Sequence, residues 1–345
     1  MKAALLGYSQ AGKKTLFALL TGRKILSAQL KEKEAPEGCA LVYDPRVDTI
    51  AKLVKPEKIK YAEIRYVLCP DVEAGSKERL WLEEARKCDL LCIVARDFAS
   101  DAVYHPAGSV DFERDKNDLM SELLFADLEI VEKRLERIAK EKRGEHKQEQ
   151  AIEEKALQKC RSVLEQGKQA NLSALEPHEE KAIRGLGLLT FKPVLCVRNI
   201  SEEKIGKLKD DVGIISISCK IEEEIAEIAD PTERQEYVKS LGLNTSGLDR
   251  MNNAIYDAMG LMSFYTMGKD EVRAWTIKKG SLAPTAAGKI HTDMERGFIR
   301  AEVIRYDDLI KLGSENAVRE HGKVAIKGKD YVIQDGDICS FLFNV

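Results

Sequence analysis

Short apolar runs alternate with helical patterns along the first hundred residues. The run Lys2–Leu6 predicts a buried strand, and a helix follows it from Lys13 to about Thr21. Asp44 before Pro45 indicates a second helix start, because an aspartate cap satisfies free N–H groups and proline at the first position loses no hydrogen bond. This alternation predicts an α/β fold with a mostly parallel sheet and helices on both faces. The later elements expected are strands Ala62–Leu68 and Leu90–Ala95 and a helix near Lys77–Lys87.

A long helical pattern begins near Asp115. Its apolar positions recur at helical spacing, at Leu119, Leu123, Ala126, Ile130, Leu135 and Ile138. Between Glu132 and Lys155, 15 of 24 residues are charged, 7 acidic and 8 basic, which predicts a solvated helical hairpin of coiled-coil type that breaks near Gly144. Charge alternation alone selects no partner. The pair is therefore either a solvated arm without a site of its own or a docking arm.

Strand patterns return at Pro193–Arg198 and Gly213–Ser218, so the hairpin is predicted to be inserted into one α/β domain. After Gly260 the pattern changes to short strands with short helices, which predicts a small α+β domain. Its expected strands are Val272–Ile277, Phe298–Ile304, Val324–Ile326, Tyr331–Ile333 and Ile338–Phe343. The predicted segments are residues 1–114 (first part of the α/β domain), 115–190 (helical arm), 191–260 (second part of the α/β domain) and 261–345 (α+β domain).

Composition narrows the class of protein. The chain has 345 residues, 44% hydrophobic and 33% charged, as expected for a globular protein of two to three domains. Lys+Arg 55 against Asp+Glu 58 leaves a net charge of −3, so no overall basic field indicates a nucleic-acid partner and DNA is not expected, although a local basic face is still compatible with one. Apolar stretches such as Leu90–Ala95 are far shorter than the roughly 20 residues of a membrane span. The eight scattered cysteines contain no CxxC and form no ligand cluster with histidines, which favours a reducing cytoplasm and predicts no zinc site.

The first strand leads into a candidate phosphate-binding loop, Gly7–Lys13, which reads G-x-x-x-x-G-K and opens a helix. Glycines allow successive N–H groups and the positive helix end to face phosphates, and Lys13 would reach the β and γ oxygens. The alternative is an ordinary turn between a strand and a helix. The predicted phosphate-binding residues are Gly7, Gln10, Ala11, Gly12, Lys13, Lys14 and Thr15.

The position after Lys13 departs from an ordinary phosphate loop. A hydroxyl there would coordinate Mg²⁺, but the chain has Lys14, and Thr15 lies about 100° further round the helix. An ammonium cannot ligate a cation, so no metal ligand is assigned.

Beyond the phosphate-loop candidate, the chain resembles the YchF family of Obg-like ATPases over essentially its whole length. Six stretches resemble the family: EEEIAEI, GLDRMNNAIYDAMGL, EVRAWTIKKGSLAPTAAGKIHTDMERGFIRAEVIRYDDL, GKDYVIQDGDICSFLFNV, DPRVDTIAKLVKPEKI and, in the arm, ADLEIVEKRLERI. The resemblance implies a P-loop G domain with a coiled-coil arm and a C-terminal TGS domain of β-grasp fold. It also implies a preference for ATP over GTP and association with ribosomes or RNA through the TGS domain.

The resemblance also assigns the base-binding residues, with Asn199-x-x-Glu202 in place of the Asn-Lys-x-Asp of GTPases. The aspartate of GTPases accepts hydrogen bonds from N1 and N2 of guanine and so selects GTP. Its loss removes that acceptor, which is consistent with binding of ATP. Ser218-Cys219-Lys220 resembles the loop that lines the purine pocket. The base-binding residues are thus Asn199, Ile200, Glu202, Ser218, Cys219 and Lys220.

Three elements depart from the family pattern together. The family has serine at the position of Lys14, a threonine in the first switch and Asp-x-x-Gly in the second. Here residues 22–48 contain no threonine, and Asp71-Val72-Glu73-Ala74 postpones the glycine to Gly75. Phosphoryl transfer depends on these elements converging on Mg²⁺ and the γ-phosphate. We therefore expect weak or absent hydrolysis, assign no catalytic residue, and question the Mg²⁺ that the family implies.

Two functions follow from these observations. The first is a ribosome- or RNA-associated protein that binds ATP or GTP. The second is an interaction or RNA-binding scaffold whose G domain no longer binds nucleotide.

Overall fold

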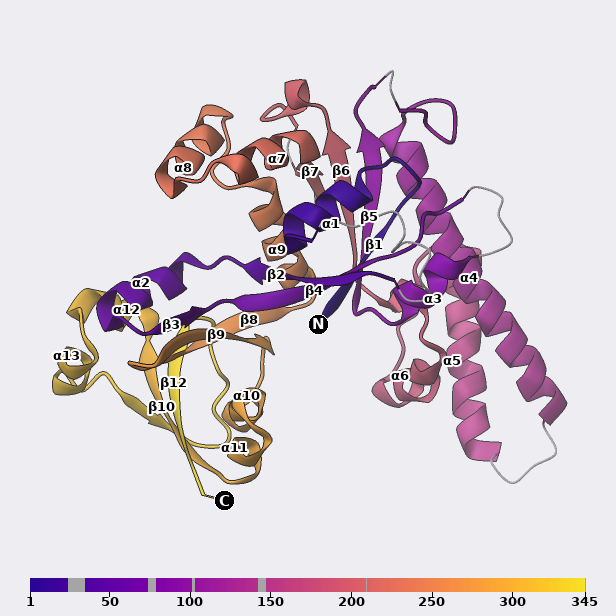
Figure 1. Ribbon diagram of the computed structural model, residues 1–345. Coiled ribbons are helices and arrows are strands. Elements are labelled where there is room, and N and C mark those ends of the chain that lie inside the picture. Colours follow the sequence, from indigo (N-terminus) through magenta and orange to yellow (C-terminus); the bar gives the residue numbers. More distant parts are fainter. Residues whose placement is uncertain (24–34, 74–78, 101–102, 142–146, 209, 345) are drawn as a thin grey trace. The chain divides into compact units, whose positions relative to one another are not determined.

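The computed structural model describes residues 1–23, 35–73, 79–100, 103–141, 147–208 and 210–344. Contacts divide the chain into two units, of which the first comprises Met1–Gly38 and Arg65–Leu248 and the second Cys39–Ile64 and Asp249–Val345 (Figure 1). No helix in the described ranges is long and apolar enough to cross a membrane.

The α/β part of the chain contains a six-stranded sheet in the order β2-β4-β1-β5-β6-β7. Its strands are β1 (Lys2–Leu6), β2 (Glu37–Val42), β4 (Ala62–Leu68), β5 (Leu90–Asp97), β6 (Val194–Ile200) and β7 (Ile214–Ile217). The pairs from β4 through β1, β5 and β6 to β7 are all parallel. The α/β fold that the sequence predicted is confirmed. Strand β2 is an element that the sequence pattern did not reveal.

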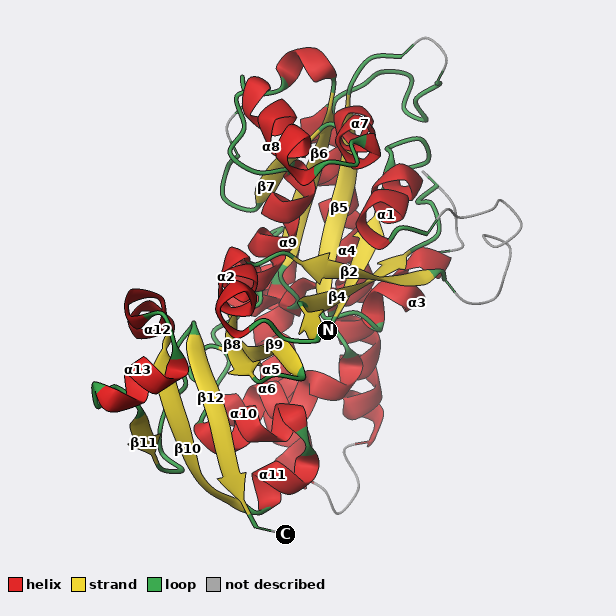
Figure 2. Ribbon diagram, turned by 60° about the vertical axis from the view of Figure 1, so that its left-hand side comes forward, coloured by secondary structure: helices red, strands yellow, loops and turns green. Residues whose placement is uncertain are grey.

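Helices cover both faces of this sheet (Figure 2). Helices α1 (Lys13–Thr21) and α7 (Cys219–Glu227) lie on one face, and α3 (Leu80–Arg86) and α4 (Phe112–Glu141) lie on the other. The core beneath α3 and α4 joins Trp81 and Leu123 to Leu6 and Ile93 of the central strands. Two further helices, α8 (Pro231–Ser240) and α9 (Gly247–Ala258), follow α7. Because β1 is almost completely buried between these layers, the loop that follows it starts from a rigid position.

The predicted helical arm is present as α4 and α5 (Lys147–Glu165), followed by α6 (Pro177–Ile183); the expected break near Gly144 lies outside the described residues. Asp127 of α4 is fully buried at the foot of the arm. Its carboxylate accepts hydrogen bonds from the backbone N–H of Leu189 (2.9 Å) and from the N–H and hydroxyl of Thr190 (both 2.7 Å). Arg86 of α3 donates to the same carboxylate at 3.3 Å. Asp127 thus joins α4 to the chain that returns to the sheet.

The second unit has a sheet in the order β11-β10-β12-β8-β9-β3. Its strands are β8 (Leu261–Met267), β9 (Glu271–Lys278), β10 (Phe298–Arg305), β11 (Ala325–Lys327), β12 (Asp337–Phe343) and β3 (Lys58–Lys60). Strands β8 and β9 form an antiparallel hairpin, and β12 runs parallel to β8 in the middle of the sheet, which is the β-grasp arrangement. Its helices include α10 (Ala283–Ile290), α11 (Thr292–Arg296), α12 (Tyr306–Leu312) and α13 (Glu315–Glu320), and most of α9 also falls in this unit. The expected strand Tyr331–Ile333 is reduced to one bridge, between Leu282 and Val332.

Residues 39–64 group with the C-terminal unit, although the sequence pattern assigned them to the segment 1–114. Strand β3 pairs with β9 in parallel register, and α2 (Pro45–Val54) is fastened to the β-grasp sheet. Arg46 forms an ion pair with Asp335 at 2.7 Å, and the Tyr265 hydroxyl donates to Asp44 at 2.5 Å. Phe264 lies in the core beneath α10, so its neighbour Tyr265 points to the opposite face, where α2 lies. Contacts between residues nearly 300 positions apart leave no local pattern in the sequence.

Candidate functional site

The glycine-rich loop leaves β1 at Gly7 and enters α1 at Lys13. Gly12 has φ +97°, and a Cβ at this position would collide with the side-chain amide of Asn199. A Cβ at Gly7, where φ is +152°, would collide with the backbone carbonyl of Val94. Both positions therefore require glycine, because the backbone has a positive φ and the neighbouring chain leaves no space for a Cβ.

Lys13 lies inside this loop rather than on its surface, with 3% of the residue exposed. Its ammonium donates to the carbonyls of Gly7 and Tyr8, the latter at 3.1 Å, and to the Asp71 carboxylate at 2.5 Å. Burial lowers the pKa of the Lys13 ammonium, and the charge of Asp71 opposes part of that shift. Asp71 was singled out from the sequence only as part of the altered second switch.

The remaining residues of the predicted phosphate set lie around this lysine. Ala11 is buried, Gln10 is exposed with a left-handed φ of +64°, and Thr15 is half-buried on α1. Lys14 is exposed. An exposed ammonium at the start of α1 adds positive charge at the helix end where anions bind favourably.

Asn199 connects the phosphate loop to the predicted base-binding loop. It lies in β6, is 4% exposed, and donates through Nδ2 to the Ala11 carbonyl at 3.1 Å. Its Oδ1 accepts the backbone N–H of Cys219 at 3.2 Å. One buried side chain thus sets the spacing between two loops that are separated by about 200 residues.

The other predicted base-binding residues differ in exposure. Ser218 is buried, and within the described chain its Oγ has no hydrogen-bond partner. Burial raises the pKa of the Cys219 thiol to about 12, so this cysteine is not a reactive thiolate. Ile200 is buried, while Glu202 and Lys220 form an exposed ion pair at 3.2 Å.

The loop after β5 carries a buried pair that sequence reasoning missed. His105 Nε2 lies 2.8 Å from Asp115 Oδ2, and the two residues are only 6% and 1% exposed. The His105 Nδ1 accepts the backbone N–H of Ala107 at 3.2 Å. The pair therefore fastens the loop to the start of α4. A histidine ten residues before an aspartate gives no recognisable signal in a sequence.

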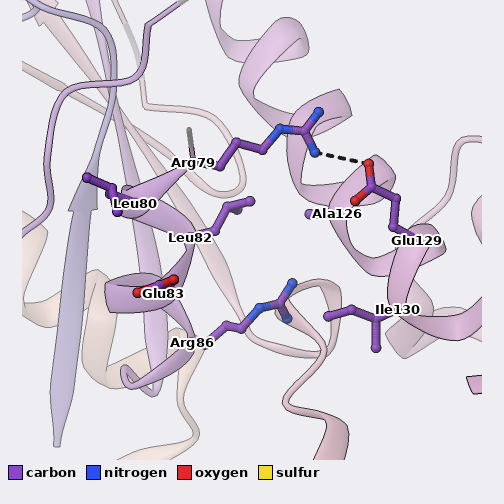
Figure 3. A pocket seen from close by; sticks show the side chains of 8 residues that line it. All are labelled: Arg79, Leu80, Leu82, Glu83, Arg86, Ala126, Glu129 and Ile130. Atoms are coloured by element: carbon purple, nitrogen blue, oxygen red, sulfur yellow. Dashed lines mark hydrogen bonds and ion pairs between the residues drawn. The ribbon is translucent and has the colours of Figure 1, made fainter. Parts of the chain in front are cut away.

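A separate hollow of about 540 Å³ lies between α3 and α4. Figure 3 shows Arg79 reaching across it toward Glu129 of α4, at 3.3 Å. It is lined by Arg79, Leu80, Leu82, Glu83, Arg86, Ala126, Glu129 and Ile130. None of these residues belongs to the phosphate-binding or base-binding sets predicted from the sequence.

The donor set near the loop does not fit Mg²⁺. An exposed lysine replaces the hydroxyl ligand, and the carboxylate of Asp71 is paired with Lys13. Residues 22–48 supply no threonine, although positions 24–34 lie outside the described residues, as do Ala74 and Gly75 of the second switch. Among the residues that the structure describes, no group of three or more His, Cys, Asp or Glu side chains is placed to hold a metal ion.

A parallel sheet whose first strand leads through a glycine-rich, lysine-ended loop into a helix defines the P-loop fold of the G-domain type. Residues 261–344 match the family model YchF-GTPase_C, described as a protein of unknown function (DUF933).

Full-length relatives give the particular family. The chain is 35% identical to the ribosome-binding ATPase YchF of Bacillus subtilis over 366 residues, covering 100% of both chains. It is 35% identical to that of Haemophilus influenzae over 362 residues, covering 100% of this chain and 99% of the relative. The structure of the Schizosaccharomyces pombe YchF GTPase superposes with a TM-score of 0.84 at 31% identity, covering 99% of this chain and 97% of that one. The chain belongs to the YchF family.

Proposed function

We propose that this protein binds a nucleoside triphosphate, ATP or GTP, with its phosphates at residues 7–15. The base would lie between Asn199–Glu202 and Ser218–Lys220. The observation that carries the proposal is the bridge formed by Asn199, which holds the glycine-rich loop beside the base-binding loop. The relatives are named ribosome-binding ATPases, which supports the same assignment.

The side chains have separable roles in this proposal. Lys13 supplies positive charge to the β and γ oxygens, and the loop N–H groups and the start of α1 supply further donors. The buried Ser218 hydroxyl, which has no described partner, is available to hydrogen-bond the base. Glu202 in place of an aspartate weakens selection for guanine, which favours ATP.

Hydrolysis should be weak or absent in this protein. The donor set does not fit Mg²⁺, and a single ammonium cannot bridge two phosphates in the geometry that a divalent ion imposes. We assign no catalytic residue.

Association with the ribosome or RNA is the second part of the proposal, and we assign it to the C-terminal β-grasp domain. The exposed basic residues of this domain include Lys278, Lys279, Lys289, Arg296 and Arg300. Together with the names of the relatives, this charge supports contact with ribosomal RNA phosphates.

The alternative function, a scaffold whose G domain no longer binds nucleotide, is favoured by one observation. The three N–H donors of the Lys13 ammonium are matched by three acceptors of the chain, the carbonyls of Gly7 and Tyr8 and the carboxylate of Asp71. A thermal-shift titration with ATP and GTP separates the two functions, because a ligand that binds only the folded state raises the melting temperature. A rise that saturates with nucleotide supports the first function, and no rise at millimolar nucleotide supports the scaffold.

Metal dependence is expected to distinguish this protein from an ordinary phosphate-loop ATPase. Because Lys14 supplies a fixed charge near the phosphates, ATP affinity should change less than about threefold between EDTA and excess Mg²⁺. Lys14→Ser should make binding depend on Mg²⁺ and restore turnover only in part, since both switch segments remain altered. Calorimetry measures the affinities, and phosphate release measures turnover. Collapse of wild-type binding in EDTA, or rapid wild-type hydrolysis, would contradict the role of Lys14.

Ribosome binding is expected to weaken steeply with salt. Neutralising the exposed lysines Lys278 and Lys279 should lower affinity and reduce the slope of log affinity against log salt by about one for each phosphate that the protein no longer neutralises. Co-sedimentation should use the full chain, because residues 39–64 belong to the same unit as this domain. Exchanging Lys207, an exposed lysine of the other unit, is the matched control. Equal binding at about 50 and about 200 mM salt would rule out a phosphate-contacting domain.

A further inference from the structure

We infer that Asp71 is an internal competitor for the phosphate-binding lysine, and that its carboxylate holds the place at Lys13 that a nucleotide phosphate would take. The inference rests on the proposed function and adds a residue that sets nucleotide affinity.

The ammonium of Lys13 is saturated by the protein. An ammonium has three N–H donors, and that of Lys13 has three acceptors: the carbonyls of Gly7 and Tyr8 and the carboxylate of Asp71. A phosphate oxygen can therefore bind the ammonium only by displacing one of these acceptors. The exchange is required because Lys13 is buried and has no spare donor directed to solvent.

Asp71 is held beside the lysine by the backbone. The next residue, Val72, donates its N–H to the Gly7 carbonyl at 3.1 Å and forms a parallel bridge with Tyr8. The second-switch segment thus continues the sheet along the edge of the phosphate loop. The carboxylate is placed at the ammonium by this pairing, and the ion pair of 2.5 Å follows from the fold.

Asp71 is also the acceptor that can leave. The two carbonyls belong to the loop backbone, which lies so close to Val94 at Gly7 that a Cβ there would collide with the Val94 carbonyl. The Asp71 side chain is 32% exposed, whereas that of Lys13 is 2% exposed, so rotation of the carboxylate carries it into water. A carboxylate that returns to water recovers its hydration, which makes it the least costly acceptor to release.

The competition follows from charge. The Lys13 ammonium and the Asp71 carboxylate neutralise each other in the protein without nucleotide. When a triphosphate binds, its phosphate oxygen must take the place of the Asp71 carboxylate at the ammonium. In a site that fits Mg²⁺, a released carboxylate near the phosphates could turn to the metal ion. Because Lys14 stands where the hydroxyl ligand of Mg²⁺ would be, the released carboxylate would stay beside the phosphates as a repelling charge.

The test compares the wild type with Asp71→Asn in EDTA, with ATP and inorganic pyrophosphate as calorimetric ligands. Asparagine keeps the size of the side chain and removes its charge, so affinity for both ligands should rise at least about tenfold. Asp71→Ala, which removes the acceptor altogether, should raise affinity by a similar or larger factor. The matched control is Glu73→Gln, which removes the same charge from an exposed residue two positions along that is not an acceptor of Lys13. Its affinity should change by less than about twofold.

The outcomes separate the inference from the proposed function. Wild type that binds ATP, with unchanged or weaker binding in Asp71→Asn, overturns the competitor role and leaves the proposed function standing. Equal gains in Asp71→Asn and Glu73→Gln also overturn it, because they indicate a general effect of charge. Folded wild type and Asp71→Asn that both fail to bind millimolar ATP overturn the proposed function and the inference together.

Discussion

Exchanging Lys13 for methionine is expected to lower the affinity for ATP by roughly 100-fold, about 2.7 kcal/mol. Methionine keeps an unbranched apolar stem of similar length in the buried position and lacks the ammonium. A triphosphate bound at the loop would then lose its main side-chain counter-charge. Isothermal calorimetry with ATP in EDTA measures the loss directly.

The control for this experiment is Lys87→Ala, which removes an exposed lysine of the same unit. Its affinity for ATP should equal that of the wild type. The melting temperature of Lys13→Met must be compared as well, because Asp71 loses its partner in this variant. Unchanged affinity in a folded Lys13→Met protein would exclude residues 7–15 as the phosphate site.

Exchanging Asp127 for alanine is expected to lower the free energy of unfolding of the first unit by about 3 kcal/mol. The change leaves the buried N–H groups of Leu189 and Thr190 without their acceptor and takes the ion-pair partner from Arg86. Urea denaturation, with the midpoint and the slope fitted separately, measures the loss. Hydrogen exchange at Leu189 and Thr190 should accelerate in the same variant, since these are the amides released.

Glu129→Ala is the matched control, two residues further along α4. Glu129 is 55% exposed and pairs with Arg79 at 3.3 Å, so its removal should cost less than about 1 kcal/mol. Equal destabilisation by the two exchanges would mean that burial of the Asp127 carboxylate is not what fastens the arm.

Elements with strong local patterns were predictable to within a few residues. Strands β1 and β4 and helix α1 have the bounds that the pattern predicted, because buried apolar runs and helix starts are local properties. Strands β2, β3 and β8 were missed. All three residues of strand β3 are exposed. The strand pairs with β9, which lies more than 200 residues further along the chain. Such a strand has no apolar pattern of its own.

The residues of the candidate site also differ in how far the sequence could identify them. The candidate phosphate loop is contiguous, so its glycines and Lys13 could be selected from spacing alone. The predicted base-binding loops needed the family resemblance, because each is too short to be specific. The hydrogen bonds of Asn199 to Ala11 and Cys219 join these parts, and they could be described only after folding.

The sequence by itself determined the α/β and α+β classes, the helical arm, the glycine-rich loop and the family, because each depends on neighbouring residues or on long matching stretches. Only the tertiary structure showed that residues 39–64 belong to the C-terminal unit, that His105 pairs with Asp115, and that the Asp71 carboxylate forms an ion pair with the Lys13 ammonium. These pairings join charged, polar or backbone groups of separate segments. They depend on which segments the fold brings within hydrogen-bonding distance, and the local order of residues does not specify that.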